Sequence, residues 1–229
     1  MTIAEGQTLT DGNSANNYTG TLDDNQKDAI KRKTMMKALG DVSYIDENGL
    51  EQTCTNYIIL SDNVFNGMTH NIGKTGYETW YVANGNYTYN TTNLQTNGYV
   101  HLILCDGANF TVNGSSYGIE VGSVLSIYSQ SQDTGTLTAN VASASGRALF
   151  VSSGNLAING GVINANGGAY GIYIDNGHLT VNRATINATG TTSDIHVDGS
   201  FTLGWTRLTD RIYTSSYNCE GTVSIKDGQ

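Results

Sequence analysis

The 229-residue chain contains no proline, only three cysteines and few charged residues. Because proline is absent, tight turns have to rely on Gly and Asn, which accept positive φ angles, and Asn-Gly pairs recur along the chain. Charged residues make up only 14% of the sequence, while Gly, Asn, Ser and Thr are abundant. This composition suits short strands joined by tight turns and argues against a helical bundle.

Neither a membrane span nor a nucleic-acid partner is indicated. No segment reaches the roughly 18 apolar residues that a spanning helix needs. Residues 1–5 lack the basic start and the apolar run of a signal peptide, so an export signal is expected outside this sequence if the protein is exported. The net charge of −9 argues against nucleic acid, and the basic cluster at Lys27 to Lys37 is offset by nearby aspartates.

The three cysteines form no recognisable framework. Cys54, Cys105 and Cys219 are an odd number, and none has the spacing of a Cys-x-x-Cys or Cys/His metal motif. We expect free thiols, with one bridge between two of them as the alternative. The sequence predicts no metal ion and no cofactor.

A repeat with a fixed period is the most informative feature of the chain. Leu149, Ile172 and Ile195 hold the same place in successive segments (172 − 149 = 195 − 172 = 23), each built from short strands and Gly or Asn turns. A fixed period of this length is typical of a solenoid. Three strands per repeat predict an all-β fold, a right-handed single-stranded parallel β-helix with about 23 residues per coil. The inward side chains of two coils would be Leu149, Val151, Leu156, Ile158 and Ile163, then Ile172, Ile174, Leu179, Val181 and Ile186.

The repeat also predicts two local features. Ile119 and Leu149 lie further apart than one period (149 − 119 = 30), and we assign the excess (30 − 23 = 7) to a polar insertion at Ser129 to Thr134. Asn164 and Asn187 are in register (187 − 164 = 23), which predicts a stacked asparagine ladder.

The predicted domains are an N-terminal region, residues 1–79, and a solenoid, residues 80–229. The first would hold a strand, a short helix near residues 24–32 and a hairpin, and would pack on the solenoid. Asn48-Gly49 between two strand-like runs is the hairpin signal.

At the far end of the solenoid, Trp205 with Leu208 and Ile212 is expected to form a C-terminal cap.

Four motifs stand out: Trp80 to Val82, Val100 to Gly107, Leu125 to Gln130, and Leu203 to Trp205 followed by Asp210 to Ile212. They resemble the β-helix modules of large cell-surface or secreted proteins of Bacteroidetes-type gut bacteria. The resemblance covers most of residues 41–229. It implies a pectate-lyase-like parallel β-helix and an extracellular or cell-surface location, but no particular reaction.

Four outward residues form a candidate ligand face. The period places Tyr173 under His196 and Asp175 under Asp198, with Asp194 expected on the same face. Paired carboxylates could bind a cation, share a proton or act as a glycosidase pair. Both aspartates also fit turns in which Asp caps its own backbone, and no Lys or Arg is in register with them. No catalytic residue is therefore assigned.

Outward aromatic residues form a second candidate for sugar binding, because they could line a groove and stack on sugar rings. They are Tyr117, Tyr128, Phe150, Tyr170 and Tyr173.

The two ends of the chain resemble one another. Val223 to Gln229 matches Met1 to Gln7 at an offset of 222 (223 − 1), with Ile, Gly and Gln identical. Open β-helix ends carry unpaired strand edges, so end-to-end pairing is physically easy. Thr2, Ile3, Val223 and Ile225 are the candidate assembly residues; the alternative is that both segments are common Gly-turn strands.

The leading hypothesis is a non-enzymatic extracellular or cell-surface structural module: a stalk, an adhesin or a self-assembling filament subunit. Its expected partners are further copies of itself, joined head to tail, or tandem neighbour modules. The alternative is a carbohydrate-binding module whose outer face takes a glycan. A polysaccharide lyase or hydrolase is the least favoured hypothesis.

Overall fold

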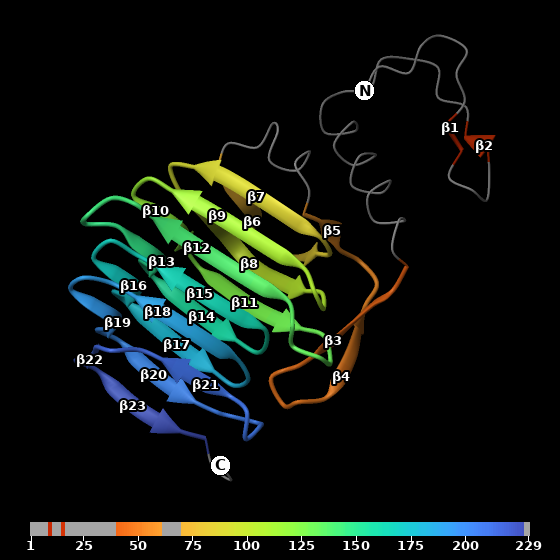
Figure 1. Ribbon diagram of the computed structural model, residues 1–229. Helices are drawn as coiled ribbons and strands as arrows, with labels where there is room; N and C mark the ends of the chain where they lie inside the picture. The colour runs from red at the N-terminus through yellow and green to blue at the C-terminus, as the bar shows by residue number, and fades with distance from the viewer. Residues whose placement is uncertain (1–8, 11–14, 17–39, 61–69, 227–229) are drawn as a thin grey trace. The chain divides into compact units, whose positions relative to one another are not determined.

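The structure is a computed structural model that describes residues 9–10, 15–16, 40–60 and 70–226 (Figure 1). The chain divides into two units, residues 1–40 and residues 41–229. In the first unit, β1 (Leu9–Thr10) and β2 (Ala15–Asn16) form an antiparallel pair. The helix expected near residues 24–32 lies outside the described residues.

The second unit is an all-β parallel solenoid of about seven turns with roughly 23 residues per turn, which confirms the predicted fold class (Figure 1). Leu149 pairs with Ile172, and Ile172 pairs with Ile195, as the sequence period requires. The described residues contain strands and turns only, and none of them forms a helix long and apolar enough to cross a bilayer.

Between residues 117 and 213, each turn contributes one strand to each of three faces, which we call faces 1, 2 and 3. Face 1 consists of β10 (Tyr117–Val121), β13 (Arg147–Val151), β16 (Tyr170–Ile174), β19 (Ser193–Val197) and β22 (Tyr217–Cys219). Face 2 consists of β11 (Val124–Ser129), β14 (Gly154–Ile158), β17 (Gly177–Val181), β20 (Ser200–Leu203) and β23 (Thr222–Ile225). Face 3 consists of β7 (Asn86–Thr91), β9 (Asn109–Gly114), β12 (Thr136–Val141), β15 (Val162–Asn166), β18 (Thr185–Thr189) and β21 (Arg211–Tyr213).

Two long strands run across faces 1 and 2 and join them into one sheet. They are β6 (Asn71–Ala83) and β8 (Leu94–Leu104), and β5 (Ile58–Ile59) pairs in parallel with β6. The start of β8 pairs with β10 of face 1, and its end pairs with β11 of face 2. Gly98, at φ 72°, provides the bend between these parts, where a Cβ would lie 2.1 Å from the Lys74 carbonyl oxygen. The parallel stack thus already includes strands that precede Trp80.

The core is a set of apolar columns that run along the solenoid axis. The inward residues predicted for two coils are all buried, including Leu149 and Ile172 at 0% exposure. Equivalent strands of neighbouring turns lie about 4.8 Å apart, so each inward side chain packs directly on its equivalent in the next turn. Burial of one Leu, Ile or Val contributes about 1.5–3 kcal/mol, so the columns hold the turns together. The face 1 column is Ile119, Leu149, Ile172, Ile195 and Tyr217.

The asparagine ladder is confirmed. Asn187 Nδ2 donates to Asn164 Oδ1 at 2.8 Å, and the two residues are paired across β15 and β18. A second ladder on face 3 runs through more turns, because the same amide contact, at 2.8 to 2.9 Å, joins Asn90, Asn113, Asn140 and Asn166 in succession. Side-chain amides carry both a donor and an acceptor, so they can bond to an identical residue above and below.

The excess over the period between Ile119 and Leu149 arises at more than the one corner predicted. Ile127 and Leu137 are twice as far apart in sequence (137 − 127 = 10) as the equivalent pair Ile158 and Ile163 (163 − 158 = 5), which places most of the excess at the Ser129 to Thr134 corner. A second insertion lies between β12 and β13, near Ala142 to Gly146.

Asp133, in the first insertion, is buried and holds two arginines from later turns. Its φ angle is 55°, and its Oδ2 accepts from Arg183 Nε at 2.6 Å and contacts Arg207 Nη1. Asp210, which is fully buried, binds Arg207 from the other side at 2.8 Å. The polar insertion is therefore tied to the following turns by a network of paired charges.

The predicted hairpin is confirmed as β3 (Val42–Ile45) and β4 (Glu51–Cys54), which pair antiparallel. Asp46 Oδ1 accepts from the backbone NH of Asn48 at 2.9 Å, and Gly49 has a φ of 81°. The hairpin packs against face 2 through one apolar cluster of Val42, Cys54, Tyr57, Val82, Ile103 and Tyr128.

At the other end, the side chain of Leu208 is 94% exposed and Ile212 is half-buried. Leu208 therefore covers no apolar surface among the described residues.

Candidate functional site

The outer side of face 1 brings together three of the four residues of the candidate ligand face. Tyr173 and His196 are paired on β16 and β19, and their rings stack with centroids 4.8 Å apart and planes 3° apart. Asp198 follows β19 directly and accepts from the Tyr173 hydroxyl at 3.0 Å. His196 Nε2 lies 2.8 Å from the other carboxylate oxygen of Asp198.

Burial and the neighbouring Asp198 carboxylate raise the pKa of the Tyr173 hydroxyl. Burial, followed by the hydrogen bond to Asp198 and the charge of that carboxylate, raises the pKa of Tyr173 to about 12. The phenol therefore stays protonated across physiological pH and acts as a fixed donor to Asp198.

Asp175 occupies the predicted equivalent position but does not join the cluster. Its backbone NH donates to Val151 at 2.9 Å, as the NH of Asp198 does to Ile174, so the two aspartates are in register. The Asp175 side chain is exposed, and it forms no hydrogen bond or ion pair with another described residue.

Asp194 does not lie on this outer face, contrary to expectation. It is buried at 4% exposure, and its carboxylate accepts from the backbone NH groups of Gly190 and Ser216 at 2.9 and 3.0 Å. Burial alone would raise the pKa of Asp194, but these bonds and those from Ser215 outweigh burial and lower it to about 2. Asp194 therefore anchors the 214–216 loop.

Arg147 was missed as a member of the face because it is in register with Tyr170 instead of with the aspartates. Its guanidinium carbon lies 4.4 Å from the Tyr173 ring centroid and 4.6 Å from that of Phe150. Phe150 is consequently only 7% exposed. The rings of this face contact one another and Arg147, which leaves less ring surface for a sugar than the sequence suggested.

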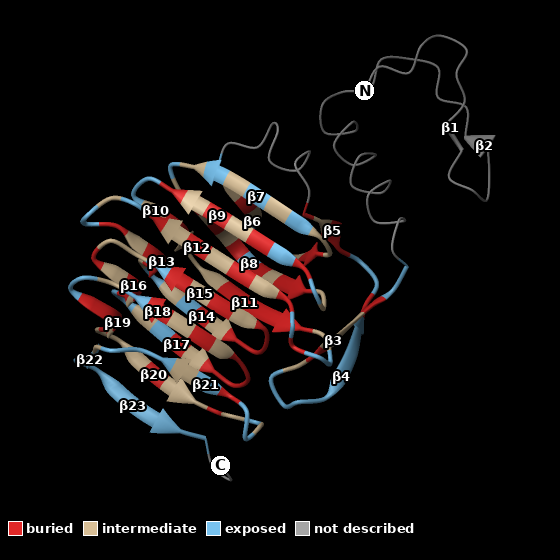
Figure 2. Cartoon of the chain, viewed as in Figure 1, coloured by how far each residue is buried: buried red, intermediate tan, exposed pale blue. Residues whose placement is uncertain are grey.

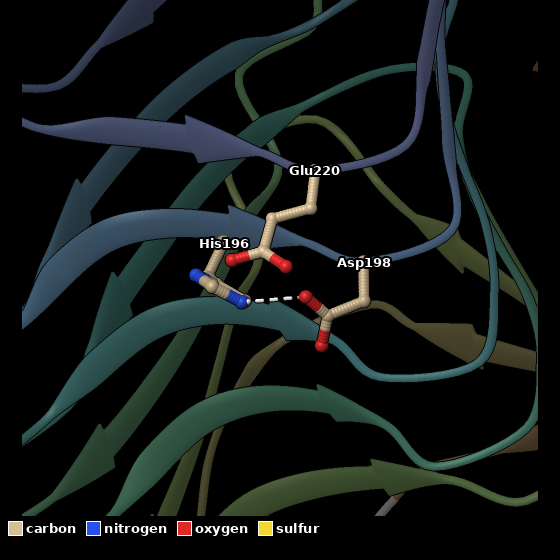
Figure 3. A group of neighbouring side chains, drawn as sticks. All are labelled: His196, Asp198 and Glu220. Carbon is tan, nitrogen blue, oxygen red and sulfur yellow. Dashed lines mark hydrogen bonds and ion pairs between the residues drawn. The ribbon is translucent and has the colours of Figure 1, made fainter.

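Glu220 was also missed, because the last turn is shorter than the period by one position. His196 pairs with Asn218 (218 − 196 = 22), so the equivalent of Asp198 is Glu220, whereas a strict period of 23 points to Gly221. His196, Asp198 and Glu220 each place one ligand-type atom within 4.8 Å of the others (Figure 3). The signal that could have found this cluster is the length of the last turn.

A hollow lies beside the hairpin on the outer side of β6. It has a volume of about 350 Å³ and is lined by Tyr44, Thr53, Cys54, Thr55, Asn56, Glu78 and Trp80. Trp80 Nε1 donates to Glu78 Oε1 at 2.9 Å, and the Trp80 ring stacks on His101 at 4.2 Å. Burial lowers the pKa of His101 despite the nearby Glu78 carboxylate, which favours the neutral imidazole. An aromatic wall beside a carboxylate is a lining that suits a polar ligand with apolar faces.

The C-terminal end of the solenoid presents an exposed strand edge. Val223 and Ile225 on β23 are 51% and 65% exposed (Figure 2), and among the described strands β23 pairs with β20 alone. Tyr217, the last member of the face 1 column, is 44% exposed. Thr2 and Ile3, their predicted partners, lie outside the described residues.

All three cysteines are free thiols in the structure, with Cys54 buried and Cys105 and Cys219 half-buried. Burial, together with the charge of Asp106, raises the pKa of Cys105 to about 11, so this thiol is a poor nucleophile.

No family model, curated protein or solved structure matches this chain. The fold class therefore rests on the observed register and burial, and the function has to be argued from the sites themselves.

Proposed function

We propose that the protein is a non-enzymatic structural module of the cell surface or extracellular space, which assembles head to tail into a filament or stalk. It would belong to the β-helix modules of Bacteroidetes-type surface proteins that its sequence motifs resemble. The observation that carries the proposal is the apolar, half-paired edge of β23.

The β23 edge continues the core columns, and no further turn covers them within the part of the chain that the structure describes. Val223 pairs with Phe201 and Ile225 with Leu203, so both side chains hold inward positions. In earlier turns such positions are covered on both sides, as for Leu179 at 1% exposure. Covering each exposed Val or Ile contributes up to about 1.5–3 kcal/mol, so adding one more strand at this edge is favourable.

The N-terminal segment of a second copy is the strand that we propose for this edge. Met1 to Gln7 matches Val223 to Gln229, so parallel pairing in register would place Ile3 next to Ile225 and Thr2 next to Ser224. The outer side of the edge fits as well, because the Thr202 and Ser224 hydroxyls bond at 2.9 Å and Thr2 would extend this row. Strand addition at a free sheet edge supplies main-chain hydrogen bonds, and the alternating side chains supply specificity.

The face 1 cluster supports a structural role more than a catalytic one. Asp198 is held by two side chains, Tyr173 is kept protonated, and Arg147 is packed between rings. Such mutual contacts stiffen neighbouring turns, which suits a rod.

The test is the oligomeric state of complementary variants, measured by light scattering after size-exclusion chromatography. We expect wild type to form a concentration-dependent series, and Ile3→Lys and Ile225→Lys each to stay monomeric. A mixture of the two should form heterodimers only, because one copy keeps an intact N-terminal segment and the other an intact edge.

Leu50→Lys is the matched control, since Leu50 is 60% exposed on the hairpin and is not part of β23. A wild-type protein that stays monomeric at high concentration, or an equal effect of Leu50→Lys, would refute the proposal.

Carbohydrate binding on the outer face is the second candidate, and the hollow beside Trp80 is the observation that favours it. A glycan array with wild type, Trp80→Ala and Tyr173→Ala separates the two outer surfaces. Loss of a hit in Trp80→Ala alone would assign the sugar to the hollow, and an array without hits would remove this candidate.

A further inference from the structure

We infer that His196, Asp198 and Glu220 form a binding site for a divalent transition-metal ion of the Zn²⁺ class. The three residues come from the last two turns of face 1 and converge on one point above the strands (Figure 3). The site is distinct from the β23 edge on face 2, so it can be tested independently of assembly.

The chemistry of the three groups selects the ion. One imidazole nitrogen and two carboxylate oxygens suit Zn²⁺, Cu²⁺ or Ni²⁺, whereas Ca²⁺ and Mg²⁺ prefer oxygen ligands alone. Three protein ligands leave at least one coordination position for water or for a donor atom of another molecule.

The geometry needs only a small adjustment. Ligand atoms in a tetrahedral site with bonds of about 2.1 Å lie about 3.4 Å apart, and the three candidate atoms lie within 4.8 Å of one another. The Glu220 side chain is exposed and can move by the required distance, up to about 1.4 Å (4.8 − 3.4), without disturbing the core. His196 Nε2 and Asp198 Oδ1 lie 2.8 Å apart, so they must separate by about 0.6 Å to admit the ion, and their side chains are 14% and 30% exposed.

Neighbouring side chains hold the two fixed ligands in place. The Tyr173 hydroxyl donates to Asp198 Oδ2, which leaves Oδ1 directed at His196 Nε2. Asn218 Nδ2 lies 3.2 Å from His196 Nδ1. If the metal takes Nε2, the imidazole proton moves to Nδ1. A flip of the Asn218 amide then gives up the 3.4 Å bond from its Nδ2 to Glu220 Oε1 and presents its oxygen to that proton. Such supporting contacts are typical of metal-bound histidine.

Binding would cross-link the last turn to the turn before it. Terminal turns of a solenoid contact a neighbour on one side only, so they open more readily than central ones. A metal that binds only the closed turn slows amide exchange in β22 by the factor 1 + [metal]/Kd, about 100-fold at 100 times Kd.

The experiment is calorimetric titration of the untagged protein with Zn²⁺, paired with hydrogen exchange over Tyr217 to Cys219. We expect one ion per chain, slower exchange in β22, and no effect of Ca²⁺. Glu220→Gln, which keeps the shape of an exposed side chain, should weaken binding at least tenfold and abolish the protection.

Two matched variants show whether the ion sits elsewhere. Asp175→Asn changes the equivalent carboxylate one turn earlier and should bind like wild type. Cys219→Ala removes the nearest thiol in β22 and should also bind like wild type. Unchanged affinity in Glu220→Gln, loss in Cys219→Ala, or no saturable binding at millimolar Zn²⁺, Cu²⁺ or Ni²⁺ would overturn the inference.

Discussion

The imidazole of His196 lies flat on the ring of Tyr173, one turn away along the solenoid axis, with the two planes 3° apart. Asp198 bonds to both side chains, so three residues from two turns act as one unit. The outer surface of face 1 is thus organised by the same repeat that builds the core.

The first prediction concerns the bond between Tyr173 and Asp198. Tyr173→Phe keeps the ring stack and removes the donor, so it should lower the free energy of unfolding at pH 7 by about 1 kcal/mol. The pKa of Tyr173 is higher in the folded chain, about 12, than in the unfolded chain, so the protonated phenol stabilises the fold fully below pH 10. The difference in unfolding free energy between wild type and Tyr173→Phe should therefore shrink as the pH rises from 10 to 12. Urea unfolding of both proteins at a series of pH values measures this; a constant difference would contradict the prediction.

The second prediction concerns acid stability. The pKa of Asp194 is lowered to about 2 in the folded chain, so its carboxylate stabilises the fold above pH 4 and loses this effect between about pH 4 and 2. Asp194→Asn should therefore lower the free energy of unfolding by about 1–2 kcal/mol at neutral pH. The difference in this free energy between wild type and Asp194→Asn should narrow as the pH falls from about 4 to 2. Asp175→Asn is the control, because Asp175 is exposed and should show no such narrowing.

The third prediction concerns the buried charge network. Asp133→Ala leaves Arg183 without its carboxylate partner and Arg207 with Asp210 alone, and removing one partner of a buried pair costs about 3–5 kcal/mol. Thermal unfolding should show a clear loss of stability. Amide hydrogen exchange should show its largest increase at the 129–136 corner. A change below about 0.5 kcal/mol, the usual size for an exposed position, would show that the network is not needed.

The fourth prediction compares two members of the inward columns. Ile172→Ala leaves a cavity in the middle of the core and should lower the free energy of unfolding by about 2–5 kcal/mol. Val223→Ala alters an inward position at the exposed edge, so in dilute protein it should cost less than about 0.5 kcal/mol. Equal costs in chemical unfolding would mean that the edge is covered in the monomer.

The repeat made the core predictable, because a fixed period assigns each residue both a strand and a side. Leu149, Ile172 and the Asn164–Asn187 ladder followed from it directly. The hairpin was predictable as well, since Asn48-Gly49 marks its turn.

The outer surface was less predictable, because it depends on where the period changes. The strict period did not predict Glu220 in the cluster because the last turn is one residue shorter than the period. It did not predict Arg147 on the face because the long side chain of Arg147 reaches the neighbouring position. Asp194 was misplaced because it bonds to corner loops that the period does not describe. The likeness of the chain ends predicts Val223 and Ile225 as assembly residues. Their exposure at the β23 edge depends on the fold and could not be predicted from that likeness.

The most direct test of the assembly is a cross-link between the two proposed partner strands. Thr2→Cys and Ser224→Cys in separate copies would place two thiols opposite each other if Met1 to Gln7 of one copy pairs with β23 of the next. After mild oxidation of the mixture, we predict a covalent heterodimer that neither single variant forms alone. Absence of that species, with wild-type assembly otherwise intact, would contradict head-to-tail pairing through these strands.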